Sequence, residues 1–184
     1  MSKVVKFDNY EMHIRNKKIT MDTLLSHYDF VKIEGYCKAC PNYGKIWSCP
    51  PYDFSAYEYL KKFSSVTLYS GEIIYDLSTL SDDEIINQRH LIYDLGRKEF
   101  RKFLMTIEGH YDKSQALIAG HCFLCEECTR VNGKKCIKPK MIRYSLEGMG
   151  IEVGTLLKEV LDQALQWDSE TTDRLITVGA VLNK

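Results

Sequence analysis

The sequence of 184 residues lacks the apolar runs that would export the chain or anchor it in a membrane. No stretch approaches the roughly 18 uninterrupted apolar residues of a membrane-spanning helix. Charged side chains interrupt the first eight residues, whereas a secretory signal needs a continuous apolar segment. We therefore expect a cytoplasmic protein that makes no contact with a membrane.

The sequence also lacks an excess of charge and the common catalytic motifs. Its 25 basic and 25 acidic side chains cancel, which argues against a protein that binds nucleic acid by neutralising phosphates. It has no nucleophile elbow, Walker loop, dinucleotide-binding fingerprint or zinc-protease helix. These absences leave open whether the protein is an enzyme.

Proline is scarce, and all four prolines lie within three residues of a cysteine. A chain of this length can bury about 70% of its unfolded surface, so it does not need disulfides to fold. The cytosol keeps thiols reduced, and an odd number of cysteines cannot pair completely. The seven cysteines therefore predict metal or redox chemistry, in loops at residues 35–54 and 120–140 of a single domain spanning 1–184.

The second loop carries four cysteines in the pattern Cys-x2-Cys-x2-Cys, followed after seven residues by the fourth; they are Cys122, Cys125, Cys128 and Cys136. Three thiolates at this spacing can hold three corners of a [4Fe–4S] cluster, as in bacterial ferredoxins. The ferredoxin pattern has three residues before its fourth cysteine, so the spacing leaves open which cluster Cys136 serves. Zinc is the alternative metal, although structural zinc sites usually use two separated cysteine pairs.

The first loop has the pattern Cys-x2-Cys-x8-Cys-Pro-Pro and carries Cys37, Cys40 and Cys49. Three interpretations stay open: a second [4Fe–4S] cluster with an open or non-cysteine fourth position, a zinc site with one other ligand, or a metal-free buried turn. An iron without a protein thiolate could act as a Lewis acid on a small-molecule ligand. Candidates for the fourth ligand are Asp53, Cys136 and a histidine, of which His121 is favoured because it adjoins Cys122.

Strands and helices alternate along the chain, which predicts an α/β or α+β fold with a central mixed sheet and flanking helices. Helices are expected at 21–28, from the capping box at Ser81 to Gly109, and at 153–165. Strands are expected at 30–34, at 65–77 with a kink at Gly71, at 116–119 and at 175–182. The Glu126-Glu127 pair is interpreted as solvated loop charge.

Taken together, the residues resemble a family. The paired cysteine patterns, the Ala119-Gly120 step before Cys122, and the tail from Arg143 to Val153 look like the prokaryotic family of predicted metal-binding proteins called domain of unknown function 2284. The resemblance implies that all seven cysteines bind metal, and that the metal is iron–sulfur; it implies no particular activity. Arg143, Ser145 and Glu147 match the tail, where we expect them to anchor the loop and cap the next helix.

These patterns lead to three functional hypotheses. The first is an iron–sulfur protein with one or two [4Fe–4S] clusters that exchanges electrons with a partner enzyme. The second is an iron–sulfur enzyme, such as a lyase or sulfur-transfer catalyst, that uses an open iron at the three-cysteine site. The third is a binding or regulatory module that zinc stabilises.

Overall fold

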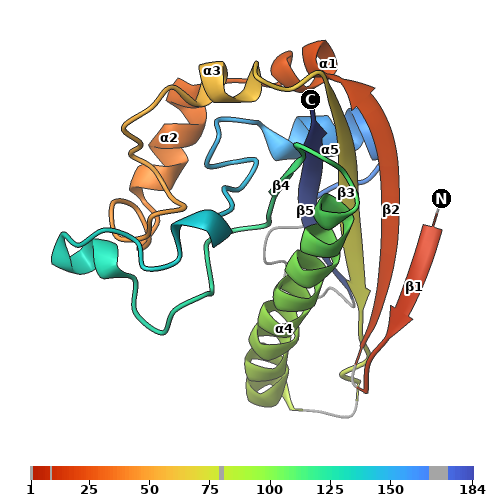
Figure 1. The fold of residues 1–184 in the computed structure, drawn as a ribbon. Coiled ribbons are helices and arrows are strands. Elements are labelled where there is room, and N and C mark those ends of the chain that lie inside the picture. Colours follow the sequence, from red (N-terminus) through yellow and green to blue (C-terminus); the bar gives the residue numbers. More distant parts are fainter. Residues whose placement is uncertain (1, 9, 79–80, 166–173) are drawn as a thin grey trace.

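A five-stranded antiparallel sheet forms the centre of the fold (Figure 1). The computed structural model describes residues 2–8, 10–78, 81–165 and 174–184. The strands follow the order β1-β2-β3-β5-β4 across the sheet, and all four pairings are antiparallel rather than mixed. They are β1 (Ser2–Lys6), β2 (Glu11–Thr20), β3 (Ser65–Ile74), β4 (Gln115–Leu117) and β5 (Arg174–Asn183).

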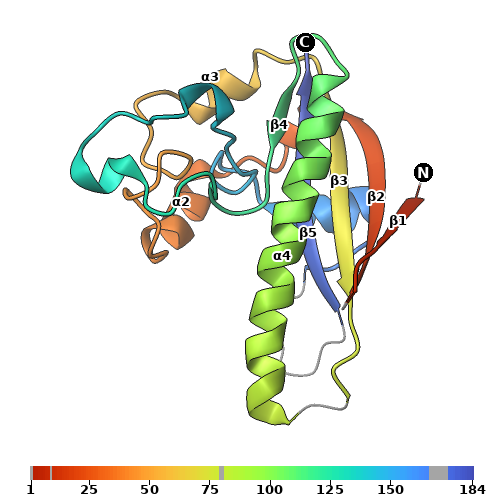
Figure 2. The ribbon, with the colours of Figure 1, turned by 60° about the horizontal axis from the view of Figure 1, so that its bottom comes forward.

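Helices cover both faces of this sheet, which makes the fold α+β. They are α1 (Met21–Leu25), α2 (Phe30–Lys38), α3 (Ala56–Leu60), α4 (Asp82–Gly109) and α5 (Val153–Leu161), with short 3₁₀ turns at Thr129–Asn132 and Pro139–Met141. Figure 2 shows α4 running along one face, while α2, α3 and the cysteine loops gather beyond the β4–β5 edge. No helix in the described part of the chain is long and apolar enough to cross a membrane.

The long helix α4 begins and ends where the sequence predicts. The Glu84 carboxylate accepts hydrogen bonds from the backbone N–H (3.0 Å) and hydroxyl (2.6 Å) of Ser81, which satisfies groups that the helix leaves unpaired. Phe100 and Leu104 are fully buried on its inner face, against strands β3 and β5. This core fixes α4 beside the cysteine loops.

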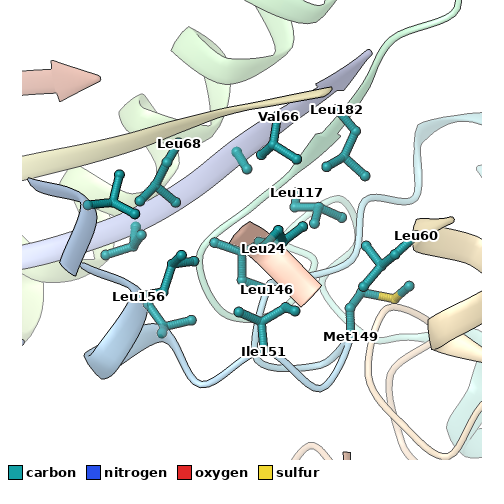
Figure 3. Close-up of a cluster of buried hydrophobic side chains, with 14 of the residues drawn as sticks. Leu24, Leu60, Val66, Leu68, Leu117, Leu146, Met149, Ile151, Leu156 and Leu182 are labelled. Carbon is teal, nitrogen blue, oxygen red and sulfur yellow. The ribbon is translucent and has the colours of Figure 1, made fainter. Parts of the chain in front are cut away.

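The opposite face of the sheet carries a second core (Figure 3). It brings Leu24 of α1, Leu117 of β4 and Leu156 of α5 together with residues that follow the second cysteine loop. Among the latter, Leu146, Met149 and Ile151 are fully buried. Burying side chains of this kind stabilises a fold by about 1.5–3 kcal/mol each, so the tail after the loop is firmly held.

The strand predicted at 30–34 is wrong, because these residues begin helix α2. Asp29 caps the helix: its carboxylate accepts the N–H of Lys32 at 3.0 Å. Val31 is 85% exposed, and Ile33 is the buried residue of the helix. Alternation over five residues does not distinguish a strand from a helix that buries a single side chain.

The kink predicted at Gly71 is also wrong, since β3 pairs without interruption with β2 and β5 from Ser65 to Ile74. A Cβ atom at Gly71 would lie 3.0 Å from the side chains of Phe100 and Thr177. The glycine therefore makes room for the ring of α4 rather than bending the strand. Strands β1 and β2 were not predicted, because only part of β2 alternates between buried and exposed residues.

Candidate metal centre

The two cysteine loops are joined by one arginine. Arg130, which lies between Cys128 and Cys136 of the second loop, donates hydrogen bonds to the carbonyl oxygens of Ile46 (2.9 Å), Cys49 (2.7 Å) and Pro51 (2.6 Å) in the other loop. A planar guanidinium can bind several carbonyls at once, so it fixes the path of the chain around Cys49. The three-cysteine loop thus takes its shape partly from the four-cysteine loop.

Two further contacts reinforce this connection. The ring of Trp47 lies 5.0 Å from the Arg130 guanidinium, and its N–H donates to the carbonyl of Lys134 at 3.1 Å. The hydroxyl of Ser48, a residue only 1% exposed, accepts the backbone N–H of Cys122 at 2.9 Å. Both loops therefore form one framework beyond the edge of the sheet.

All four cysteines of the second loop line one small cavity of about 30 Å³. Trp47 and Ser48 of the other loop also line it, together with Leu124 and Ile142. The Cys136 sulfur accepts the N–H of Lys138 at 3.3 Å, and the Lys138 ammonium donates to Leu124 O at 2.8 Å. The structure thus brings Cys136 to the same cavity as Cys122, Cys125 and Cys128, which spacing alone left open.

The three other cysteines line a separate and much larger cavity of about 890 Å³. Cys37 lies in the last turn of α2, and Cys40 and Cys49 follow in the loop. Helix α4, the first half of β5 and the tail after the second loop complete the walls. The volume lies within the range of small-molecule pockets, roughly 300–1,000 Å³.

The seven thiols are free, and burial keeps several of them protonated in the metal-free chain. Burial raises the pKa of the Cys49 thiol to about 11 and also raises the pKa of Cys122. The pKa of Cys37 is raised by burial first and by the nearby carboxylate of Glu147 second. Because the thiolate is the metal ligand, these cysteines must release protons when they bind a metal.

Glu147 is a candidate residue that sequence reasoning placed only as an anchor. Its side chain lines the larger cavity, and its Oε2 atom is buried without a hydrogen-bond partner in the described part of the chain. Burial raises the pKa of this carboxyl group. A single glutamate in a sequence with many charged residues gives no pattern that would predict its burial. Only the fold shows that Glu147 is buried beside the cavity.

The other two residues of the tail behave as structural anchors. Arg143 forms a buried ion pair with Glu108 of α4 and donates to the carbonyls of Lys140 (3.0 Å) and Ile142 (2.8 Å). The Ser145 hydroxyl accepts the N–H of Gly148 at 2.9 Å and closes a turn. The expected helix cap is absent from these residues, because Glu152 is the N-cap of α5 and makes no side-chain capping bond.

Of the fourth-ligand candidates named from sequence, the structure brings two histidines to the larger cavity, the half-buried His121 and the exposed His90. The Nδ1 atom of His121 lies 3.3 Å from Asn42 Nδ2, and burial lowers the pKa of His121. Asp53 is exposed and lines neither cavity within the described chain, and Cys136 lines the smaller one. Glu126 and Glu127 are both exposed, in keeping with solvated loop charge.

A basic group not predicted from sequence also borders the larger cavity. The Arg97 guanidinium lies 4.7 Å from the ring of Tyr93 and 4.9 Å from the ring of Phe123, and pairs with Asp94 at 2.6 Å. Gly120 has a φ of +65°, and a Cβ atom there would lie 2.6 Å from this guanidinium. The glycine before Cys122 thus permits both the turn and the close approach of Arg97.

Comparison with known protein families assigns this chain to one of them. A family model described as "Predicted metal-binding protein (DUF2284)" matches residues 26–183, which include both cysteine loops and the tail. The chain belongs to this family. No curated protein and no solved structure gives a significant match.

Membership in the DUF2284 family supports metal binding without identifying the metal. Among the described residues, no three His, Cys, Asp or Glu side chains converge closely enough to hold a single metal ion. The cysteines instead surround two cavities, four at one and three at the other.

Proposed function

We propose that this DUF2284 protein carries two iron–sulfur clusters and passes electrons to a partner protein. The observation that carries the proposal is the set of four thiols around one small cavity. Sulfur donors and a largely apolar wall that includes the ring of Trp47 suit a [4Fe–4S] cluster, which supplies one-electron chemistry when bound. Cys122, Cys125, Cys128 and Cys136 would hold it.

The arrangement favours a cluster over zinc. A tetrahedral zinc site brings its sulfurs to about 3.8 Å from one another, since Zn–S bonds are about 2.3 Å long. A cubane separates its cysteines further, because four iron atoms lie between them. Among the described residues these thiols do not converge on a single-ion site, and their Cys-x2-Cys-x2-Cys spacing fits the larger group better.

The second cluster would be held by Cys37, Cys40 and Cys49. These thiols line one cavity. They also interact electrostatically, because negative charge on Cys40 or Cys37 raises the pKa of Cys49. The hydrogen bonds of Arg130 hold the backbone of this loop in place. A fixed ligand loop suits electron transfer, because little of the protein has to rearrange when the charge changes.

The surface beside the four-cysteine cavity suits an acidic redox partner. Four exposed lysines flank Cys136; they are Lys134, Lys135, Lys138 and Lys140. Exposed apolar side chains lie among them, namely Val131 (53% exposed), Ile137 (67%) and Met141 (46%). Apolar contact and opposite charge together favour rapid and specific docking, although Glu126 and Glu127 reduce the net charge of this surface.

Purification under anaerobic conditions tests the metal assignment. The two-cluster proposal predicts a brown protein with about eight irons per chain and broad absorption near 400 nm. Cys125→Ser should remove about half of the iron, whereas the control Glu126→Gln in the same loop should leave it unchanged. A colourless protein with stoichiometric zinc would contradict the proposal.

The larger cavity favours a second candidate function, chemistry on a small molecule at the three-cysteine centre. Its volume of about 890 Å³ can accommodate a ligand, and the guanidinium of Arg97 offers a place for an anionic group. An iron with an exchangeable ligand there would supply Lewis acidity. Binding of a substrate would then change the spectrum of one cluster and leave the other unchanged; no response to any small molecule would argue for electron transfer alone.

A further inference from the structure

The carboxylate of Glu147 occupies an unfavourable position in the metal-free chain. Its Oε2 atom has no access to solvent and no hydrogen-bond partner among the described residues. Leaving a buried polar group unpaired costs about 1–3 kcal/mol, and more when the group is charged. The charge of Arg97 and contacts with Ser145 and the backbone act on this carboxyl group, but none of them gives Oε2 a direct partner.

The fold holds Glu147 in this position from both sides. Before it, the carbonyl of Tyr144 accepts the N–H of Ile118 at 2.8 Å, which ties the tail to the end of β4. After it, the carbonyl of Gly150 accepts the N–H of Asp29 at 2.9 Å, which ties the tail to the start of α2. The neighbouring Leu146 is fully buried in the core, so the carboxylate cannot easily swing out to water.

The same segment contacts the three-cysteine loop. A Cβ atom at Gly148 would lie 2.7 Å from the hydroxyl of Tyr52, and that hydroxyl donates to Ser48 O at 3.0 Å. The rings of Tyr52 and Tyr144 meet edge to face at 5.1 Å. Glu147 thus reaches the cavity of Cys37, Cys40 and Cys49 from a segment packed on their loop.

Two other donors around this cavity already have partners, and a third, His90 of α4, is exposed to solvent. The carboxylate of Glu152 forms an ion pair with Lys32 at 2.6 Å. His121 has Asn42 beside its Nδ1 atom at 3.3 Å. Among the carboxylates that line the cavity, Glu147 is therefore the one whose buried oxygen remains available to a metal.

We propose that the carboxylate of Glu147 is the fourth protein ligand of the metal centre at Cys37, Cys40 and Cys49. This inference rests on the proposed function, because it requires a cluster at those cysteines. Three thiolates leave one iron of a [4Fe–4S] cluster without a sulfur ligand from the protein, and Glu147 supplies an oxygen. Oxygen is a harder and more exchangeable ligand than thiolate, so this iron is the one that an outside molecule would reach.

The test reconstitutes the protein with ⁵⁷Fe(II) and sulfide under anaerobic conditions and records iron content and the Mössbauer spectrum. About one iron in eight should differ from the thiolate-bound irons in the wild-type protein. Glu147→Cys should retain full iron and lose this distinct signal, since a thiolate takes the place of the carboxylate. Glu147→Gln should lose that iron or change its signal, because an amide is a weaker ligand.

Two variants serve as matched controls. Glu152→Gln changes a carboxylate on the same cavity that is already paired, and His121→Gln changes the competing donor. Both should retain the distinct iron signal. Wild-type spectra from both Glu147 variants, or loss of the signal in His121→Gln alone, would overturn the assignment of Glu147. An unchanged iron content in Cys40→Ser would instead overturn the second cluster itself, and the ligand assignment with it.

Discussion

The hydroxyl oxygen of Ser48 accepts a hydrogen bond from the backbone N–H of Cys122 at 2.9 Å, although 74 positions separate the two residues. Ser48 is almost fully buried, so water cannot replace the bond. It links the residue before Cys49 to the first cysteine of the other loop. The two candidate metal centres therefore share one framework, and a disturbance at one should reach the other.

Ser48→Ala should destabilise the metal-free protein by about 1–3 kcal/mol, because it removes a buried hydroxyl and leaves the half-buried N–H of Cys122 without an acceptor. Denaturant unfolding followed by circular dichroism measures this change. Ser26→Ala removes an exposed hydroxyl that donates to Thr23 O and serves as the control. Equal stability of the two variants would show that the Ser48 bond does not hold the loops together.

Glu147→Gln should stabilise the metal-free protein at neutral pH by about 1–3 kcal/mol, because a neutral amide neither buries a charge nor takes up a proton on folding. Burial raises the pKa of Glu147 above its unfolded value of 4.5, so the folded state retains a proton that the unfolded state releases. Wild-type stability therefore falls as the pH rises above 4.5 through the folded pKa. The advantage of the variant should vanish below pH 4.5, as measured by thermal unfolding across pH; an advantage independent of pH would contradict this account.

Metal uptake at the three-cysteine centre should become stronger as the pH rises. Burial raises the pKa of Cys49 to about 11, and the pKa of Cys37 is also raised, so both thiols must release a proton at pH 7. Each such thiol should increase the apparent affinity about tenfold per pH unit. Reconstitution of the metal-free protein with Fe(II) and sulfide between pH 6 and 8, followed by absorption near 400 nm, measures this dependence, and a flat profile would show that the thiols do not bind as proposed.

Lys134→Glu combined with Lys135→Glu should slow electron exchange with an acidic carrier protein by about tenfold at low ionic strength, through loss of electrostatic attraction. Stopped-flow absorption with an acidic ferredoxin as donor measures the rate. The difference should shrink at high salt, since salt screens exposed charges. Lys17→Glu on the exposed part of β2 is the matched control. If it slowed electron exchange equally, the partner would not dock specifically at the lysines beside Cys136.

The sequence predicts the local features of this protein better than its long-range ones. The capping box at Ser81 and the spacing of Cys122, Cys125 and Cys128 are local patterns whose physical meaning depends on few residues. The strand predicted at 30–34 fails because a short alternation also fits a helix with one buried residue, Ile33. A local sequence pattern therefore predicts an element correctly where a second local signal, such as a capping box, supports it.

The site beyond the cysteines could not be predicted in this way. Glu147 reaches the cavity of Cys37 because its segment packs between the end of β4 and the start of α2. The spacing of residues in the sequence does not reveal these contacts. Arg130 joins the loops through bonds to carbonyl oxygens, which any residue provides. Both residues become recognisable only when the fold shows which groups are buried together.

We propose that the two cysteine groups hold separate iron–sulfur clusters within one framework. The most direct measurement is iron and acid-labile sulfide per chain in anaerobically purified protein, compared among wild type, Cys125→Ser and Cys40→Ser. Wild type should contain about eight irons and eight sulfides, and either variant should lose about half of them. Zinc in place of iron, or a wild-type iron content that Cys40→Ser and Cys125→Ser both leave unchanged, would contradict this proposal.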